Sequence, residues 1–250
     1  MDPIQNPVLD ATSSPVPNPT PVMKLEPIGA TLKQSWAVFK QHMNLFLYTS
    51  GLMAGALVVW ALMVTPNPKA QPEDLAASMP MFFAGIILLI VLGLFSQLMM
   101  TILALRRTES WTFQSLFKAV TPKIGGYIVL SILTGLAVFV GMFLFVLPGI
   151  YLAVALSFGS YVYLDQGTSA TDSLSKSREL VKGLWWPVFG RFVVLVIIFM
   201  VVSVIVTVPF GQASKIGGVA NALVSLVLMP AATVYFVLIY EQLKKIKTGV

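Results

Sequence analysis

The sequence predicts an all-α integral membrane protein with about six transmembrane helices, arranged as three helical hairpins. Two observations lead to this fold class. Apolar residues make up 57% of the 250 residues and charged residues only 10%, whereas a soluble domain carries roughly 25% charged residues. In addition, apolar stretches that suit the ~30 Å hydrocarbon core of a bilayer recur along the chain. The surface of this chain therefore suits lipid better than water.

The segment before the first apolar stretch has a different composition. Residues 1–27 contain seven prolines, with Asn, Ser and Thr between them. Such a segment cannot bury enough apolar area to offset its ordering entropy. We therefore expect a disordered, Pro-rich cytoplasmic tail over residues 1–27 and a single polytopic membrane domain over residues 28–250. The alternative, a docking site for a proline-recognising partner, lacks a P-x-x-P motif with a flanking basic anchor.

Six segments qualify as spans or nearly do: residues 44–64, 81–105, 124–147, 150–164, 188–208 and 219–240. Only Pro148 and Gly149 separate the third span from the fourth. One continuous helix over residues 125–164 would be ~60 Å long, about twice the bilayer core. Because proline lacks a backbone donor and glycine tolerates positive φ, we predict a tight hairpin turn at this pair.

The orientation follows from the basic residues in the short loops, which accumulate on the cytoplasmic side of membrane proteins. With the predicted spans, fourteen basic residues lie on one side: Lys24, Lys33, Lys40, Arg106, Arg107, Lys118, Lys123, Lys176, Arg178, Lys182, Arg191, Lys244, Lys245 and Lys247. The other side has only Lys69 and Lys215. Both termini are therefore predicted to be cytoplasmic.

A short amphipathic segment precedes each pair of spans on the cytoplasmic side. Their apolar stripes are Ile28, Leu32, Trp36, Phe39 and Met43 in the first, Phe113, Leu116, Phe117 and Val120 in the second, and Ala170, Leu174, Ser177, Val181 and Leu184 in the third. Each hairpin would thus follow a cytoplasmic interfacial helix. In the third, Ser169 and Asp172 match a capping box.

We expect the third interfacial helix, over residues 169–183, to brace the fifth span. Ser177 is the small residue of its apolar stripe, and we expect it to permit close approach of another helix. In that case Ser177→Ala is tolerated and Ser177→Leu is not. The alternative is that the Ser177 hydroxyl itself forms a hydrogen bond or a binding contact.

A local resemblance covers about a fifth of the chain. The stretch from residue 147 to 191, with LPGIYLAVALSF followed by SLSKSRELVKGLWWPVFGR, resembles the membrane domain associated with glycerophosphoryl diester phosphodiesterases and related uncharacterised bacterial inner-membrane proteins. The matching positions are Pro148, Gly149, Leu174, Ser177, Leu180, Gly183 and Trp186. Arg178 departs from the family, which usually has a Trp there. The resemblance implies architecture and a location in the bacterial cytoplasmic membrane, without the attached phosphodiesterase domain.

Residues that carry chemistry are few. The chain has no cysteine and one histidine, His42, which we expect at the interface because a lone histidine is rarely a metal ligand. We expect Arg191 to be an anchor that snorkels to the cytoplasmic interface beside Trp185 and Trp186.

The three acidic residues Asp165, Asp172 and Glu179 are expected in a turn, a cap and a solvated face. The sequence thus predicts no catalytic, cofactor-binding or metal-binding residue, and no cofactor.

Gly51 and Gly55 form a GxxxG motif inside the first span, where small residues let helix backbones approach closely. We expect packing within the monomer and do not predict the homo-oligomer that the motif could also serve. Scattered hydroxyls in the spans more often bond to their own helix than line a path.

These patterns favour a non-enzymatic polytopic membrane protein, an envelope or membrane accessory or scaffold factor. The alternative is a small transporter or permeation subunit for an apolar or lipid-like substrate, which would not need buried charges. The basic residues lie between apolar spans and not in one patch, so the expected partner is a bilayer with anionic headgroups at the cytoplasmic face rather than nucleic acid.

Overall fold

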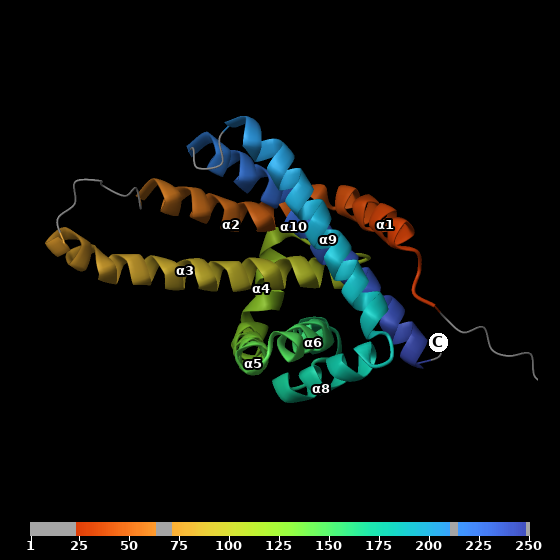
Figure 1. Cartoon of the computed structure of the whole chain (residues 1–250). Helices are drawn as coiled ribbons and strands as arrows, with labels where there is room; N and C mark the ends of the chain where they lie inside the picture. Colours follow the sequence, from red (N-terminus) through yellow and green to blue (C-terminus); the bar gives the residue numbers. More distant parts are fainter. Residues whose placement is uncertain (1–23, 64–71, 211–214, 249–250) are drawn as a thin grey trace, which may run out of the picture.

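The computed structural model describes residues 24–63, 72–210 and 215–248. Every regular element within these ranges is a helix (Figure 1). The expected Pro-rich tail falls almost wholly outside the described residues, because the description begins at Lys24. The prediction of an all-α membrane protein is confirmed.

The first unit consists of α1 (Ile28–Gln41), α2 (Met43–Met63) and α3 (Pro72–Leu105). α1 begins directly after Pro27, a residue that cannot donate a helical hydrogen bond and so suits a helix start. His42 ends α1, and α2 follows at the next residue. α3 extends beyond the predicted span and continues through Pro80.

The second unit begins with α4 (Phe113–Val120), which a reciprocal capping box between Thr112 and Ser115 starts. A 3-10 turn, η1 (Thr121–Lys123), then leads into α5 (Ile124–Leu144). α6 (Val146–Leu156) and α7 (Gly159–Gln166) return along α5 and together form the fourth span. The fourth span is therefore a broken helix.

The predicted hairpin between the third and fourth spans is present, but its turn is at Phe145 and not at Pro148-Gly149. Phe145 is extended, with φ −158° and ψ 142°, and lies between α5 and α6. Pro148 occupies the first turn of α6, where its missing N–H costs nothing. Gly149 does not have positive φ; instead it lets the helices touch, since a Cβ on Gly141 would lie 3.0 Å from the Gly149 Cα.

The third unit contains α8 (Ala170–Val181), α9 (Trp185–Thr207), η2 (Val208–Phe210) and α10 (Lys215–Thr248). Two glycines with positive φ, Gly167 at 65° and Gly183 at 83°, mark the two ends of the α8 region. At these two positions glycine is needed, because other residues rarely adopt this conformation. α8 packs mainly on α5, α6, α7 and α10, so it braces the preceding hairpin and not, as expected, the fifth span.

Five helices in the described part of the chain are long and apolar enough to cross a membrane. They correspond to the second through sixth predicted spans. α2, the remaining predicted span, is an apolar helix of 21 residues, and about 20 residues are needed to cross a bilayer core. A short helix followed by a hairpin of longer helices thus occurs three times within the described residues.

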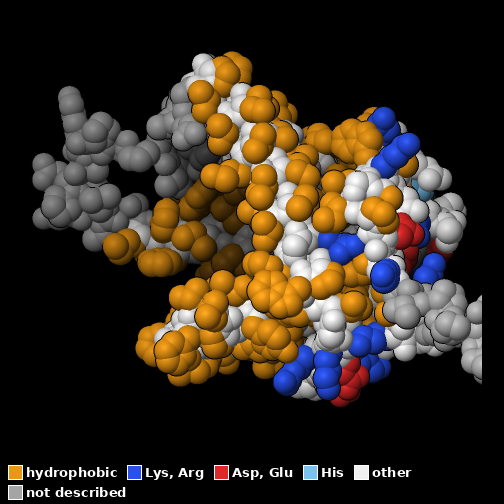
Figure 2. Space-filling view, turned by 45° about the vertical axis from the view of Figure 1, so that its right-hand side comes forward, with side chains coloured by type: hydrophobic (Ala, Val, Ile, Leu, Met, Phe, Trp, Pro, Cys, Tyr) orange, Lys and Arg blue, Asp and Glu red, His pale blue; other side chains and the backbone are white. Residues whose placement is uncertain are grey.

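The hydrophobic core lies where the three hairpins meet. It includes Phe46 of α2, Leu103 of α3, Phe158 between α6 and α7, and Tyr240 of α10. Away from it the hairpins diverge (Figure 1), and large apolar side chains such as Phe143 of α5 are up to 83% exposed. Figure 2 shows the Lys and Arg side chains gathered at one end of the molecule, with hydrophobic side chains covering the other. We call the first of these the basic end.

Candidate functional site

The polar contacts between elements concentrate where α6, α7, α8 and α10 meet. The helix of the fourth span breaks at Ser157 and Phe158, between α6 and α7. Ser177, fully buried on α8, donates its hydroxyl to the carbonyl oxygen of Ala155 at 2.8 Å. Ser177 Oγ also accepts from the backbone N–H of Phe158 at 3.1 Å. One hydroxyl therefore satisfies a carbonyl and an amide close to the break.

This geometry changes the interpretation of Ser177. Small size does matter locally, because a Cβ on Gly159 would lie 2.9 Å from Leu174 Cδ2 and the two elements are in close contact. The hydroxyl, however, has two partners in a buried place, where an unpaired polar group is costly. The expectation that Ser177 acts through size alone, so that alanine is tolerated, does not follow from this arrangement.

The apolar stripe predicted for α8 does face the protein. Val181 is buried, whereas Leu174 and Ala170 pack against the core as half-buried side chains. The start of the helix differs in detail from a capping box: Ser169 Oγ accepts from the N–H of Asp172 at 3.2 Å and donates to the Asp172 carboxylate at 2.6 Å. The Asp172 carboxylate thus accepts a hydrogen bond from the Ser169 side-chain hydroxyl. In a full capping box it would accept from the Ser169 backbone N–H.

Asp165, predicted as a turn residue, connects α7 to α10. Its carboxylate accepts from the Tyr240 hydroxyl at 2.7 Å and from Lys244 Nζ at 2.8 Å. Gln166 extends the network, since its amide N–H donates to Tyr240 Oη at 3.4 Å and its carbonyl oxygen accepts from Lys176 Nζ at 2.8 Å. α7, α8 and α10 are therefore linked by one set of polar contacts.

A second ion pair holds the loop after α3 against α10. Arg107 donates to both carboxylate oxygens of Glu241, at 2.6 and 2.9 Å. The hydrogen bond to Glu241 raises the pKa of Arg107 above its ordinary value. Both side chains remain roughly 30% exposed, and solvent-exposed pairs typically contribute only ~0–1 kcal/mol.

Arg191 does not snorkel outward as expected. It is 6% exposed and donates to the carbonyl oxygens of Pro187 at 2.9 Å and Glu26 at 2.6 Å. Its Nε is buried without a hydrogen-bond partner among the described residues. Arg191 therefore ties α9 to the segment that precedes α1, a contact between residues 165 positions apart.

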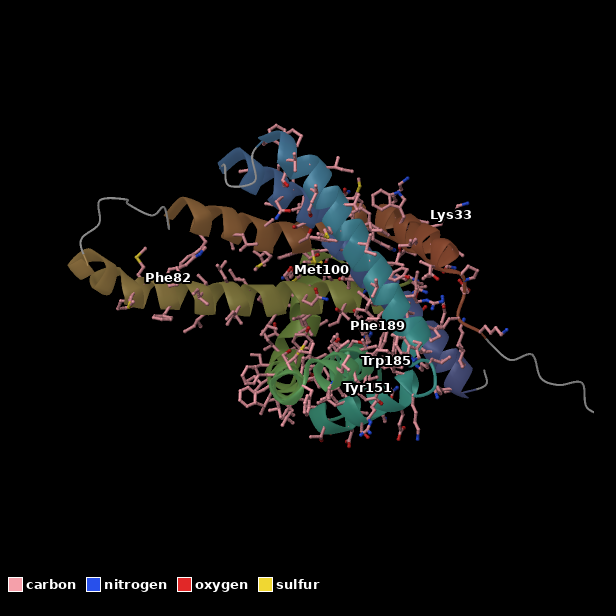
Figure 3. The ribbon with its side chains drawn as sticks, in the orientation of Figure 1. Lys33, Phe82, Met100, Tyr151, Trp185 and Phe189 are labelled. Atoms are coloured by element: carbon pink, nitrogen blue, oxygen red, sulfur yellow. The ribbon has the colours of Figure 1, made fainter. Side chains whose placement is uncertain are left out.

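The tryptophans at the start of α9 have separate environments. Trp185 stacks on Phe189, with ring centroids 4.9 Å apart, and on Tyr151 of α6 at 5.9 Å (Figure 3). Trp186 is 74% exposed, which suits a side chain of the aromatic belt. Trp185 thus contributes mainly to packing between α6 and α9.

His42 lines a hollow of about 390 Å³ with Lys40, Asn44 and Trp111. Its Nε2 is buried without a partner among the described residues, and the ring as a whole is half-buried. No carboxylate belongs to this hollow, and no group of three or more His, Asp or Glu side chains that could hold a metal ion occurs in the described ranges.

The GxxxG motif does not bring two backbones together in the monomer. A Cβ on Gly51 would touch only Leu226 Cδ1 of α10, at an ordinary 3.8 Å, and a Cβ on Gly55 would touch nothing within 4 Å. Instead, Ser50 donates to the Leu226 carbonyl at 3.0 Å and Ser96 of α3 donates to the Thr49 carbonyl at 2.5 Å. These hydroxyls, and not Gly51 or Gly55, join α2 to α10 and α3.

Several hydroxyls of the other spans follow the local pattern that the sequence indicates, whereas Ser203 Oγ of α9 is buried without a partner among the described residues. Thr101, Thr134, Ser157 and Thr207 each donate to a carbonyl oxygen three or four residues earlier in their own helix. None of these four residues lines the hollow beside His42 or the two apolar hollows along α9 and α10. These four hydroxyls are therefore satisfied within their own helices and do not link one helix to another.

No family model matches the sequence, no curated protein matches it, and no solved structure matches the fold. The resemblance at residues 147–191 stays a prediction.

Proposed function

We propose that the chain is a non-enzymatic multi-pass membrane protein that serves as an accessory or scaffold factor at the cytoplasmic face of a bacterial inner membrane. The observation that carries this proposal is the use of its polar side chains. Ser177, Asp165, Arg191 and Arg107 all form contacts between separate elements of the fold. A reaction site would need a nucleophile, a base or an electrophile aimed into a cavity.

The distribution of charge supports a role at the membrane surface. α1, α4 and α8 carry Lys33, Lys118, Lys176 and Arg178 as exposed or half-buried side chains. Each basic residue near an anionic leaflet contributes ~1 kcal/mol of attraction. Three such helices would hold the three hairpins in register with the headgroups and gather anionic lipid around them.

The second candidate is a small transporter or permeation subunit for an apolar or lipid-like substrate. The observation that favours it is a wholly apolar hollow of about 550 Å³ between α9 and α10, lined by residues such as Val202, Leu223 and Val227. An apolar substrate would need no buried charge along its path.

Reconstitution into vesicles that contain phosphatidylglycerol separates the two candidates. For the scaffold, fluorescently labelled phosphatidylglycerol should be enriched around the protein, as measured by energy transfer from its tryptophans. The rate at which the labelled lipid crosses the bilayer should equal the rate in protein-free vesicles. Neutralising Lys176 and Lys182 to Gln should lower the enrichment. Lys69→Gln with Lys215→Gln provides the matched control, because the sequence predicts both of these lysines on the opposite side of the membrane.

Faster transbilayer movement than in protein-free vesicles would contradict the scaffold and support the transporter. If the two double variants lost the phosphatidylglycerol enrichment equally, the proposed role at one membrane surface would be contradicted.

A further inference from the structure

A groove of about 380 Å³ lies between the interfacial helix α1 and the spans α9 and α10. Trp36 of α1, Phe192 and Phe199 of α9, and Leu228 and Ala232 of α10 are among its lining residues. Its volume is within the range of roughly 300–1,000 Å³ that small-molecule sites occupy. From Phe192 to Phe199 the groove follows α9 for about 10 Å, at 1.5 Å per residue.

The wall of the groove is apolar. Of its two polar lining residues, Ser35 donates its hydroxyl to the Leu32 carbonyl at 2.8 Å. The Tyr235 hydroxyl has no hydrogen-bond partner among the described residues, but it is buried and so is not exposed to the groove. A polar ligand would lose its hydration in such a groove without gaining hydrogen bonds. The part of an occupant that enters the groove must therefore be hydrocarbon.

The groove opens toward the side of the molecule that faces lipid. Val196 and Met229, on its two transmembrane walls, are 63% and 50% exposed. α9 has little protein around it, because only 6% of its most apolar 18-residue window is buried. In a bilayer, acyl chains surround these surfaces and are the hydrocarbon at hand.

Positive charge flanks one end of the groove. Lys40 Nζ lies 5.6 Å from the ring centroid of Trp36, at the α1 rim. Arg191, one helical turn before the lining residue Leu195, is buried and has no carboxylate within ion-pair distance among the described residues. The lining itself contains no acidic side chain. This charge favours an anionic over a zwitterionic headgroup.

We propose that the groove is a specific lipid site: it holds one acyl chain of an anionic phospholipid, with the phosphate beside Lys40 at the Trp36 rim. α1 closes the site from the headgroup side, and α9 and α10 hold the chain. This inference does not depend on whether the protein is a scaffold or a transporter, because it concerns a resident lipid and not its movement.

Native mass spectrometry of the full chain, purified in detergent and supplied with phosphatidylglycerol or phosphatidylcholine, tests the proposal. We expect one phosphatidylglycerol to be retained in preference to phosphatidylcholine. Ala232→Phe should fill the groove and weaken retention roughly tenfold. Ala220→Phe is the matched control, because Ala220 is on the same helix but lines the other hollow between α9 and α10.

Lys40→Gln should reduce the preference for phosphatidylglycerol roughly fivefold, the effect of one basic residue at an anionic surface. This exposed residue should leave the fold intact, so the test does not depend on Ala232→Phe alone. Equal retention of both lipids by the unaltered chain, or equal retention of phosphatidylglycerol by the Ala232→Phe and Ala220→Phe variants, would overturn the proposal.

Discussion

The Ser177 hydroxyl of α8 donates a 2.8 Å hydrogen bond to the carbonyl oxygen of Ala155, at the end of α6. It also accepts from the Phe158 N–H, on the other side of the helix break. α8 and the broken fourth span are thus joined by one buried side chain. The break is stable because its backbone groups have partners, as buried backbone groups generally must.

Ser177→Ala should lower the free energy of unfolding by about 1–3 kcal/mol, because it leaves a buried amide and a buried carbonyl without this partner. Chemical unfolding in lipid nanodiscs measures the change. Ser175→Ala, at an exposed position of the same helix, should stay within about 0.5 kcal/mol of the unaltered chain. If Ser177→Ala proved as stable as Ser175→Ala, the hydroxyl would have no structural role.

Gly149→Ala should destabilise the hairpin of α5 and α6 by about 1–3 kcal/mol through overpacking. The added Cβ would lie 2.7 Å from the backbone nitrogen of Met142, which cannot move aside as a side-chain tip can. Gly135→Ala on α5 is the control, because nothing lies within 4 Å of a Cβ there. Thermal unfolding that failed to separate these two variants would mean that the helices do not approach so closely.

Asp165→Ala should cost about 1 kcal/mol in the same assay, because the buried Tyr240 hydroxyl loses its acceptor. This loss of stability should be at the low end of the ~1–3 kcal/mol range for an unpaired buried group. The reason is that the Asp165 side chain is 30% exposed and solvent screens its ion pair with Lys244. Glu179→Ala, on the exposed face of α8, should have no measurable effect. A cost for Glu179→Ala as large as that for Asp165→Ala would point to general surface charge instead of this contact.

Deleting residues 1–24 should leave thermal stability nearly unchanged, whereas deleting residues 1–27 should lower it. The longer deletion removes the Glu26 carbonyl that accepts from Arg191, and the Glu26 N–H that donates to Gln242 at 3.1 Å. A hydrogen bond to a charged group contributes about 1.5–3 kcal/mol. Melting in detergent compares the two deletions, and equal melting temperatures would show that the Glu26 contacts are dispensable.

The sequence was sufficient for the elements whose cause is local. The length of each apolar stretch predicts a span, and the stripe from Ala170 to Leu184 predicts the face that α8 buries. The hairpin near Pro148 followed from helix length alone. Its turn at Phe145 did not, because the position depends on how closely Gly141 and Gly149 pack.

The contacts of the candidate site could not be predicted from the sequence. Ser177 and Ala155 are 22 residues apart, and Arg191 and Glu26 are 165 apart. Such pairs depend on tertiary packing that one chain's periodicity does not encode. The one available signal was Arg191, a charge inside an apolar segment, since such residues are rare and usually paired.

The most direct test of a multi-pass chain with both termini in the cytoplasm is a set of topology reporter fusions in a bacterial host. Fusions within residues 1–27 and after Lys247 should read as cytoplasmic, and a fusion near Lys69 should read as external. The fourteen-to-two distribution of basic residues predicts this result. An external reading after Lys247, with the N-terminal fusion cytoplasmic, would require an odd number of spans and contradict the three hairpins.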